Sequence, residues 1–128
     1  MILGIGTDIV NKHRIKQILN NFPNTFAKKI LSNLELRVFE ELANLEQKVA
    51  YLAKRFAAKE SIAKSIGAGI GALGLKNLQV LNHANGKPYV RILTELGKFF
   101  PACENVQIDI SISDEKEYAV AFALAHRQ

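Results

Sequence analysis

The spacing of apolar residues divides the chain into a helical first half and a second half made mainly of strands. Residues 2–7 are apolar and predict a first strand, after which Asp8 is a candidate cap for a helix over 8–19. The pattern Ser-x-x-Glu over 32–35, followed by apolar positions at helical spacing, predicts a second helix to about residue 43. A third and longer helix is predicted over 46–66.

The second half alternates apolar and polar residues, as half-buried strands do. Asn85-Gly86 lies between two such runs and predicts a hairpin, because both residues tolerate positive φ. The final run is apolar on both faces, so we expect both of its faces to be covered. The predicted strands span 75–81, 89–93, 106–113 and 118–125. Helices that precede hairpins indicate an α+β fold with a mainly antiparallel sheet packed with a long helix.

The composition is that of a soluble globular protein with one domain over residues 1–128. The single cysteine, Cys103, cannot form an internal disulfide, which suits a reducing interior. The first residues lack a basic leader, and the longest apolar run, over 118–125, is far shorter than the roughly 20 residues that a membrane span needs. We therefore expect a cytoplasmic protein without a membrane span.

The formal net charge of the whole chain is +5, and the positive charges are concentrated in its first half. No acidic residue occurs between Ile9 and Leu34, whereas the basic ones are Lys12, Arg14, Lys16, Lys28 and Lys29. A surface of one sign suggests an anionic partner: a nucleic acid, an acidic lipid or an acidic protein. The alternative is a helix face that is simply solvated.

Asp8 is the first residue that could carry chemistry. In a strand its neighbours on the same face are Gly6 and Gly4, which have no side chains. The carboxylate would then lie at the end of a bare backbone groove that a ligand can approach closely. From this segment alone, a plain helix cap is the competing interpretation.

The long predicted helix carries a second charged cluster. Glu60 and Lys64 share one helix face, and Arg55 and Lys59 form an adjacent ridge. A glutamate among three cations suits a diphosphate and its metal ion, because the carboxylate can bind the metal while the cations bind phosphate oxygens. The alternative is an exposed Glu60–Lys64 pair of little energetic weight.

A glycine-rich stretch follows this helix. Gly69, Gly71 and Gly74 have the spacing of a dinucleotide-binding fingerprint, but they follow a helix and precede a strand, which is the wrong context. The stretch also lacks the Lys-Ser/Thr of a P-loop. We interpret these glycines as the end of the helix and a turn of the chain.

Taken together, these segments resemble the holo-acyl-carrier-protein synthases, the short single-domain branch of the 4′-phosphopantetheinyl transferases. The resemblance covers nearly the whole chain, and the pairing of its first two motifs is specific. The segments are Gly4-Ile5-Gly6-Thr7-Asp8-Ile9-Val10, Arg55-Phe56-Ala57-Ala58-Lys59-Glu60-Ser61, Gly67-x-Gly69-Ile70, Asn85-Gly86-Lys87-Pro88 and Ser111-x-Ser113.

The resemblance implies a 4′-phosphopantetheinyl transferase-like single domain with a particular set of site residues. Asp8 and Glu60 match two carboxylates that bind Mg²⁺ with the diphosphate of coenzyme A. Lys64 matches a lysine that faces the phosphates, and Arg55 a cation near the nucleotide. The segment Asn85, Gly86, Lys87 and Pro88 matches a loop beside the adenosine, and Arg14 matches a residue that meets the acidic carrier protein.

The implied reaction is attack by a serine hydroxyl of the carrier on the β-phosphate of coenzyme A, with release of 3′,5′-ADP. Enzymes of this kind mainly position reactants and stabilise charge. Lys64 would offset charge on the bridging oxygen, and Glu60 or a water molecule would serve as base. The family is typically a homotrimer with sites between subunits. Some members have a histidine where this chain has Asp114, so no role is transferred to that residue.

Two other functions compete with this hypothesis. A small basic nucleic-acid-binding module could use residues 9–34 as a phosphate footprint, although that segment has few aromatic residues for stacking. A non-catalytic protein that binds coenzyme A is the third possibility. We expect an acyl carrier protein and coenzyme A as partners, and no nucleic acid.

Overall fold

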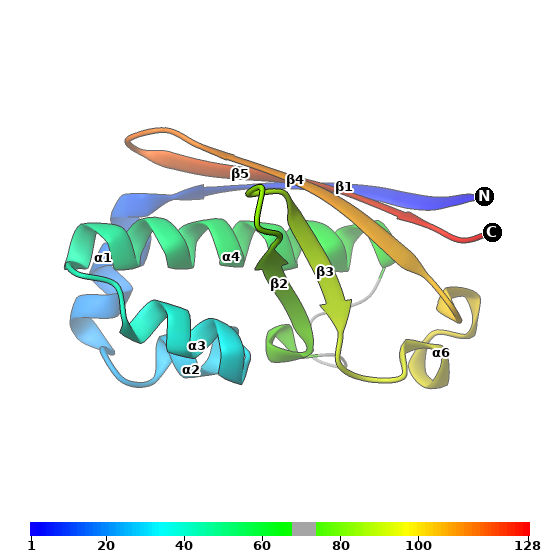
Figure 1. The fold of residues 1–128 in the computed structure, drawn as a ribbon, viewed down its shortest axis with the longest axis horizontal. Helices are drawn as coiled ribbons and strands as arrows, with labels where there is room; N and C mark the ends of the chain where they lie inside the picture. Colours follow the sequence, from blue (N-terminus) through cyan, green and yellow to red (C-terminus); the bar gives the residue numbers. More distant parts are fainter. Residues whose placement is uncertain (68–73) are drawn as a thin grey trace.

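The computed structural model describes residues 1–67 and 74–128 and confirms the predicted α+β class. A three-stranded antiparallel sheet with the order β1-β5-β4 lies across the long helix α4, and a separate hairpin, β2-β3, crosses beside it (Figure 1). In chain order the elements are β1 (Ile2–Asn11), α1 (Lys12–Asn21), α2 (Phe26–Ile30), α3 (Asn33–Glu40), α4 (Leu45–Ile66), η1 (Leu75–Asn77), β2 (Leu78–Asn82), β3 (Pro88–Ile92), α6 (Leu96–Phe99), η2 (Pro101–Cys103), β4 (Gln107–Asp114) and β5 (Tyr118–His126). None of the described helices is long and apolar enough to cross a membrane.

The first strand is longer than the sequence predicts. β1 pairs with β5 as far as Asn11, which lies opposite Tyr118. Asn11, not Asp8, caps α1, because its side-chain oxygen accepts a hydrogen bond from the backbone N–H of His13 at 2.8 Å. The cap interpretation of Asp8 is therefore wrong. Pairing with β5 continues the strand past Asp8, and this long-range contact outweighs the local capping preference.

The long helix has a defined cap at each end. Asn44 accepts a hydrogen bond from the backbone N–H of Gln47 at 2.9 Å, and Gly67 ends the helix in the left-handed conformation with φ +72°. This confirms the predicted helix over 46–66 to within one residue. Gly67, the first residue of the glycine-rich stretch over 67–74, ends the helix as predicted. Gly69 and Gly71 lie outside the described residues.

Helix α3 begins with the predicted capping box. The Ser32 hydroxyl accepts from the backbone N–H of Glu35 at 3.3 Å, and the Glu35 carboxylate accepts from the backbone N–H of Ser32 at 2.8 Å. The short helix α2 before it was not predicted. It buries only two residues, Ala27 and Ile30, which is too few to give a helical period in the sequence.

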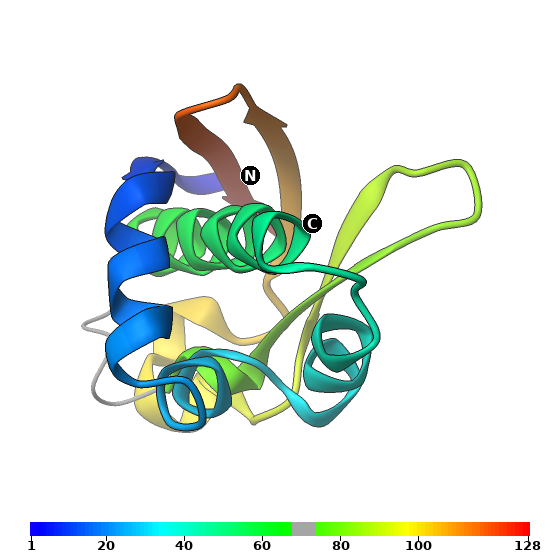
Figure 2. The ribbon, with the colours of Figure 1, turned by 90° about the vertical axis from the view of Figure 1, so that its left-hand side faces the viewer.

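The predicted hairpin forms, but with a longer connection than a two-residue turn. The backbone N–H of His83 donates to the Lys87 carbonyl across the loop at 2.9 Å, and among the loop residues only Gly86 has positive φ, at +91°. Because β2 ends at Asn82 and β3 begins at Pro88, the loop spans residues 83–87. Figure 2 shows this hairpin projecting away from the rest of the molecule, on the side opposite α1.

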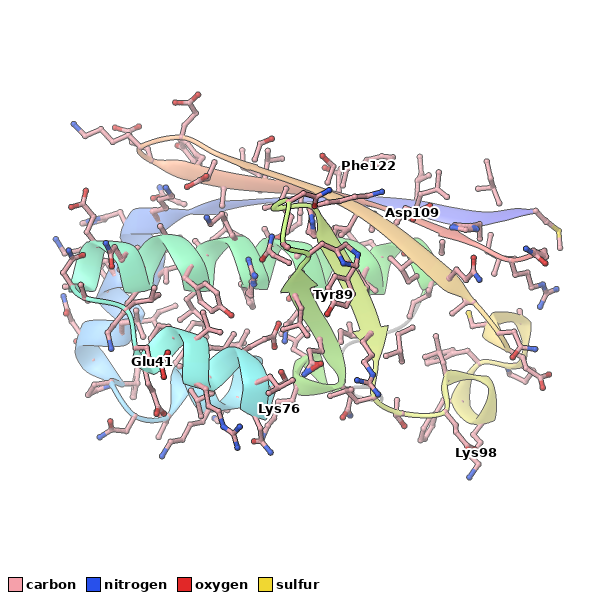
Figure 3. The ribbon with its side chains drawn as sticks, viewed as in Figure 1. Glu41, Lys76, Tyr89, Lys98, Asp109 and Phe122 are labelled. Carbon is pink, nitrogen blue, oxygen red and sulfur yellow. The ribbon has the colours of Figure 1, made fainter. Side chains whose placement is uncertain are left out.

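The three-stranded sheet is covered on one face only. The alanines of β5 point toward α4 and are buried, namely Ala119, Ala121, Ala123 and Ala125. The other face carries exposed apolar side chains of β1 and β5, namely Ile5, Ile9, Tyr118, Val120 and Phe122. Figure 3 shows Phe122 on this outer face. We call these five residues the outer apolar face.

Candidate active site

The two glycines before Asp8 bring β1 directly onto α4. A Cβ atom at Gly4 would collide with the backbone carbonyl of Ser65, and one at Gly6 with that of Ser61. The sequence predicted a bare groove open to a ligand, and this is wrong, because the helix itself fills the groove. The glycines instead set a close helix–strand distance, which places Asp8 beside Glu60 and Lys64 of α4.

Asp8 and Glu60 line the same cavity. The cavity lies between β1, α1, α2 and α4, and Arg14 also lines it. Asp8 faces α4 because it follows Gly4 and Gly6 on the same face of β1, and Glu60 is half-buried on the helix. Residues 52 positions apart in the sequence therefore meet at one place.

Lys64 lies at the edge of this pair. Its Nζ donates to the Thr7 carbonyl at 2.9 Å and contacts the Asp8 carboxylate at 3.2 Å. The pKa of Glu60 is raised, first by burial and then by the negative charge of Asp8, while Lys64 opposes the shift. The two carboxylates therefore repel each other, and Lys64 only partly compensates for that repulsion.

This donor set fits a hard divalent cation. Two carboxylates that share a cavity and repel each other are stabilised by a positive ion between them. Among the described residues, no group of three or more His, Cys, Asp or Glu side chains could hold a metal. Mg²⁺ is commonly bound by one or two carboxylates, with waters and substrate phosphates as the other ligands, so two are sufficient.

Apolar side chains also line the cavity. Ile15 and Ile18 of α1, Phe26 of α2 and Phe56 of α4 line it. The rings of Phe26 and Phe56 lie 6.1 Å apart in a tilted arrangement. The sequence placed Phe56 on the face of Glu60 but gave no signal for Phe26, because α2 was not predicted. The cavity thus combines carboxylates, a cation and an apolar wall.

Lys59 does not join the other cations of its motif. Its side chain is 0% exposed, and its Nζ donates to the Glu35 carboxylate at 2.5 Å and to two backbone carbonyls. The expectation that it could bind phosphate is therefore wrong. Position 59 is one residue from Glu60, but about 100° around the helix, which turns Lys59 away from the cavity.

Arg55 is also buried, with 7% of the residue exposed. Its guanidinium donates to the Asn82 side chain at 2.6 Å and lies over the Tyr51 ring, 4.5 Å from its centroid. Asn82 in turn donates to the Gly86 carbonyl at 2.9 Å. Arg55 therefore connects α4 to the base of the hairpin, and its Nε is a buried donor that has no hydrogen-bond partner among the described residues.

The predicted site residues thus fall into two groups. Asp8, Glu60, Arg14 and Lys64 lie around the cavity at β1 and α4. The predicted adenosine loop, Asn85 to Pro88, lies at the tip of the hairpin, which projects away from α1 and β1 (Figure 2). One chain does not bring the two groups together.

Asp114 has partners of its own at the end of β4. Lys12 donates to its carboxylate at 2.7 Å and to the Glu115 carbonyl at 2.6 Å. The hydrogen bond from Lys12 lowers the pKa of Asp114, and the charge of Lys54 contributes in the same direction. The Asp114 carboxylate is therefore already engaged by cations of the same chain.

Comparison with known proteins agrees with this architecture. A family model described as the 4′-phosphopantetheinyl transferase superfamily matches residues 4–123. A holo-[acyl-carrier-protein] synthase of Ehrlichia chaffeensis is 38% identical over 100% of this chain and 99% of its own length. The crystal structure of the synthase from Neisseria meningitidis has a TM-score of 0.88 and 40% identity, and covers 99% of this chain and 100% of that one.

A third relative was solved with a ligand. The synthase from Bacillus anthracis, described as a complex with CoA (3′,5′-ADP), has a TM-score of 0.83 and 32% identity over 100% of this chain and 99% of that one. The fold, the cavity and the family match together define the class: this chain is a transferase of the 4′-phosphopantetheinyl transferase superfamily. Within that superfamily it belongs to the family of holo-[acyl-carrier-protein] synthases.

Proposed function

We propose that this protein transfers the 4′-phosphopantetheine group of coenzyme A to a serine of an apo acyl carrier protein, in a Mg²⁺-dependent reaction that releases 3′,5′-ADP. The observation that carries the proposal is the cavity in which Asp8 and Glu60 face each other beside Lys64 and Arg14. The relative solved with coenzyme A supports the choice of donor.

Asp8, Glu60 and the neighbouring Lys64 would each have a part in this reaction. The serine oxygen forms a bond to the β-phosphorus, the bridging P–O bond breaks, and the electron pair leaves with 3′,5′-ADP. Lys64 places a positive charge where the leaving oxygen becomes negative. Glu60 or a water molecule would accept the serine proton. Asp8 and Glu60 would hold Mg²⁺, which supplies charge neutralisation at the diphosphate.

The carrier would dock over α1. Arg14 is exposed and lines the cavity together with Ile18, so one patch offers a cation and an apolar contact. An acidic helix of a carrier can pair with Arg14 at the rim while an apolar side chain contacts Ile18 and Phe26. This arrangement would direct the carrier serine toward the carboxylates.

The active form would be a homotrimer with its sites between subunits. A single chain leaves the outer apolar face uncovered, and large exposed apolar patches are typical of interaction surfaces. A single chain also separates the hairpin loop from α1 and β1, two of the elements that line the cavity (Figure 2). If a second copy covered the outer apolar face, its hairpin could complete the coenzyme A site of the first.

The reaction itself would take place in the cytoplasm.

A mass-spectrometric assay tests the proposed function. The protein is incubated with coenzyme A, Mg²⁺ and an apo acyl carrier protein, and the carrier should gain one phosphopantetheine group. Removal of the metal with a chelator should stop the gain, and Mg²⁺ added in excess should restore it.

The same assay separates the competing functions. A protein that binds coenzyme A but modifies none of several apo carriers would be a binding protein and not a transferase. A protein that modifies no carrier but binds nucleic acid tightly, with a strong dependence on salt, would support the basic-module alternative.

A further inference from the structure

The contact between α4 and the sheet is made of unusually small residues. β1 contributes Gly4 and Gly6, and β5 contributes its four buried alanines. The helix itself buries Ala53, Ala57 and Ala58 completely. Small residues allow a close approach but give few ridges and grooves that interlock, so packing alone fixes the rotation of such a helix only weakly.

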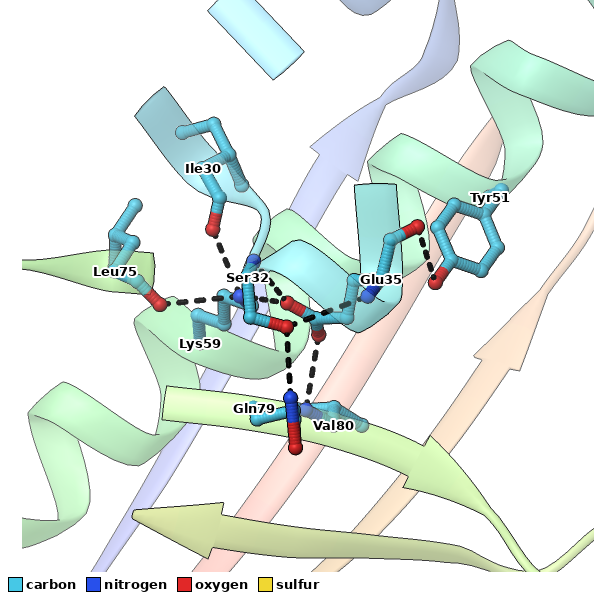
Figure 4. Close-up of polar contacts among 8 residues, drawn as sticks. All are labelled: Ile30, Ser32, Glu35, Tyr51, Lys59, Leu75, Gln79 and Val80. Atoms are coloured by element: carbon cyan, nitrogen blue, oxygen red, sulfur yellow. Dashed lines mark hydrogen bonds and ion pairs between the residues drawn. The ribbon is translucent and has the colours of Figure 1, made fainter. Parts of the chain in front are cut away.

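Lys59 anchors α4 through hydrogen bonds on a side of the helix other than the one that contacts the sheet. Its Nζ donates three hydrogen bonds: to the Glu35 carboxylate at 2.5 Å, the Ile30 carbonyl at 2.7 Å and the Leu75 carbonyl at 3.1 Å (Figure 4). An ammonium group has three donors, so all of them are used. The acceptors belong to α3, the end of α2 and the 3-10 turn before β2.

Glu35 connects Lys59 to strand β2 as well. One carboxylate oxygen accepts from Lys59 and from the backbone N–H of Ser32, and the other accepts from the backbone N–H of Val80 in β2 at 2.9 Å. Ser32 also accepts from the Gln79 side chain at 3.0 Å. Lys59 and Glu35 are both completely buried, so water does not compete for these bonds.

The anchor lies next to Glu60 in the sequence. Since Lys59 and Glu60 are about 100° apart around the same helical turn, any rotation of α4 that shifts Lys59 must also shift Glu60 relative to Asp8. We propose that Lys59, with Glu35 as its counter-ion, is a positioning residue that fixes the rotation of α4 and so the separation of the carboxylates of Asp8 and Glu60. The inference rests on the proposed role of these two carboxylates as metal ligands.

The test removes both buried charges together, so that neither is left unpaired. In the double variant Lys59→Met and Glu35→Gln, the glutamine can still accept from Ser32, which keeps the cap of α3. Circular dichroism and thermal melting check the fold. Mn²⁺ binding is then measured by electron paramagnetic resonance in the presence of coenzyme A, alongside the Mg²⁺ concentration that half-saturates transfer. Lys48→Met is the matched control, because Lys48 lies on the same helix and its Nζ lies over the Phe39 ring, 5.1 Å from the ring centroid.

A folded double variant should bind Mn²⁺ at least about tenfold more weakly and need correspondingly more Mg²⁺, because displacements of about 1 Å have large effects at reacting centres. The KM for the carrier should change less than the metal requirement, and Lys48→Met should match the wild type. Unchanged Mn²⁺ binding in the folded double variant would overturn the inference and leave the proposed function intact. A wild-type protein that neither binds Mn²⁺ nor modifies a carrier would instead refute the proposed function, and the inference with it.

Lys59→Arg is the second variant, for use if the double variant does not fold. It keeps a cation opposite Glu35, but a planar guanidinium is larger and cannot direct three donors from one nitrogen toward the same three acceptors. Weaker Mn²⁺ binding in folded Lys59→Arg supports the inference, and wild-type binding contradicts it.

Discussion

At the scale of single residues, substitution of Asp8 distinguishes a structural role of its carboxylate from a functional one. Asn11 caps α1, so Asp8→Asn should leave the fold and the melting temperature nearly unchanged. If Asp8 and Glu60 bind the metal, Asp8→Asn and Glu60→Gln should each reduce transfer at least about 100-fold, measured as carrier modified per minute. Glu40→Gln, which changes an exposed carboxylate of α3, is the control. Near-normal turnover of Asp8→Asn across a range of Mg²⁺ concentrations would contradict the assignment.

Arg14 tests the surface proposed for the carrier. Its charge lies at the rim of the cavity, where opposite charges mainly accelerate encounter. Arg14→Glu should raise the KM for the carrier severalfold and leave the KM for coenzyme A nearly unchanged. Added salt should weaken the wild type more than the variant, because screening acts within roughly 10 Å at 0.1 M.

The control for Arg14 is Lys98→Glu, which makes the same charge change on α6. If Arg14→Glu altered coenzyme A binding and spared the carrier, this part of α1 would face the nucleotide. If neither KM changed, the basic segment would be only a solvated helix face, the alternative that the sequence left open.

At the scale of secondary-structure elements, the Lys12–Asp114 pair joins the start of α1 to the end of β4. Lys12 lowers the pKa of Asp114, so the folded state binds this proton less tightly than the unfolded state does. The pair therefore stabilises the fold above the unfolded pKa, and the stabilisation is lost as the pH falls through the folded pKa. Because the carboxylate is largely exposed, the stabilisation is at most about 1 kcal/mol.

Asp114→Asn should therefore lower the melting temperature by a few degrees at pH 7, and the difference should shrink as the pH falls through the lowered pKa of Asp114. Melting curves at several pH values measure this, and 1 M salt should reduce the difference at neutral pH. Glu117→Gln in the same turn is the control. A difference that persisted undiminished at the lowest pH would show that Asp114 acts by packing and not by charge.

At the scale of the whole molecule, the outer apolar face determines whether the chain assembles. Phe122 is 44% exposed at the centre of this face, between β1 and β4. If a homotrimer buries it, Phe122→Glu should shift the solution mass from three chains to the single-chain value of 14.2 kDa, and transfer should fall with it. Light scattering coupled to size exclusion measures the mass.

Phe22→Glu is the matched control, because Phe22 is 58% exposed but lies at the end of α1, away from the sheet. It should leave the mass unchanged. A wild-type protein that remains a single chain at working concentrations and still transfers would contradict the trimer and the sites between subunits.

The sequence alone determined the elements whose cause is local. The capping box at Ser32 and Glu35, the end of α4 at Gly67 and the alternation in β4 and β5 depend on residues close in the chain, and all three are confirmed. The motifs around Asp8 and Glu60 also indicated the family, because short motifs at fixed separations are recorded in the sequence itself.

The tertiary structure decided everything that depends on which surfaces meet. It turned the glycine groove of β1 toward α4 and not toward a ligand, and it extended β1 past Asp8 through pairing with β5. It also placed two lysines of the same helix in different environments: Lys59 lies in the interior, and Lys64 lies beside Asp8. Lys59, Glu60 and Lys64 are all charged residues of one helix, and their local sequence does not distinguish them. Only the packing of α4 between the sheet and α3 determines which of them faces water, a partner charge or the cavity.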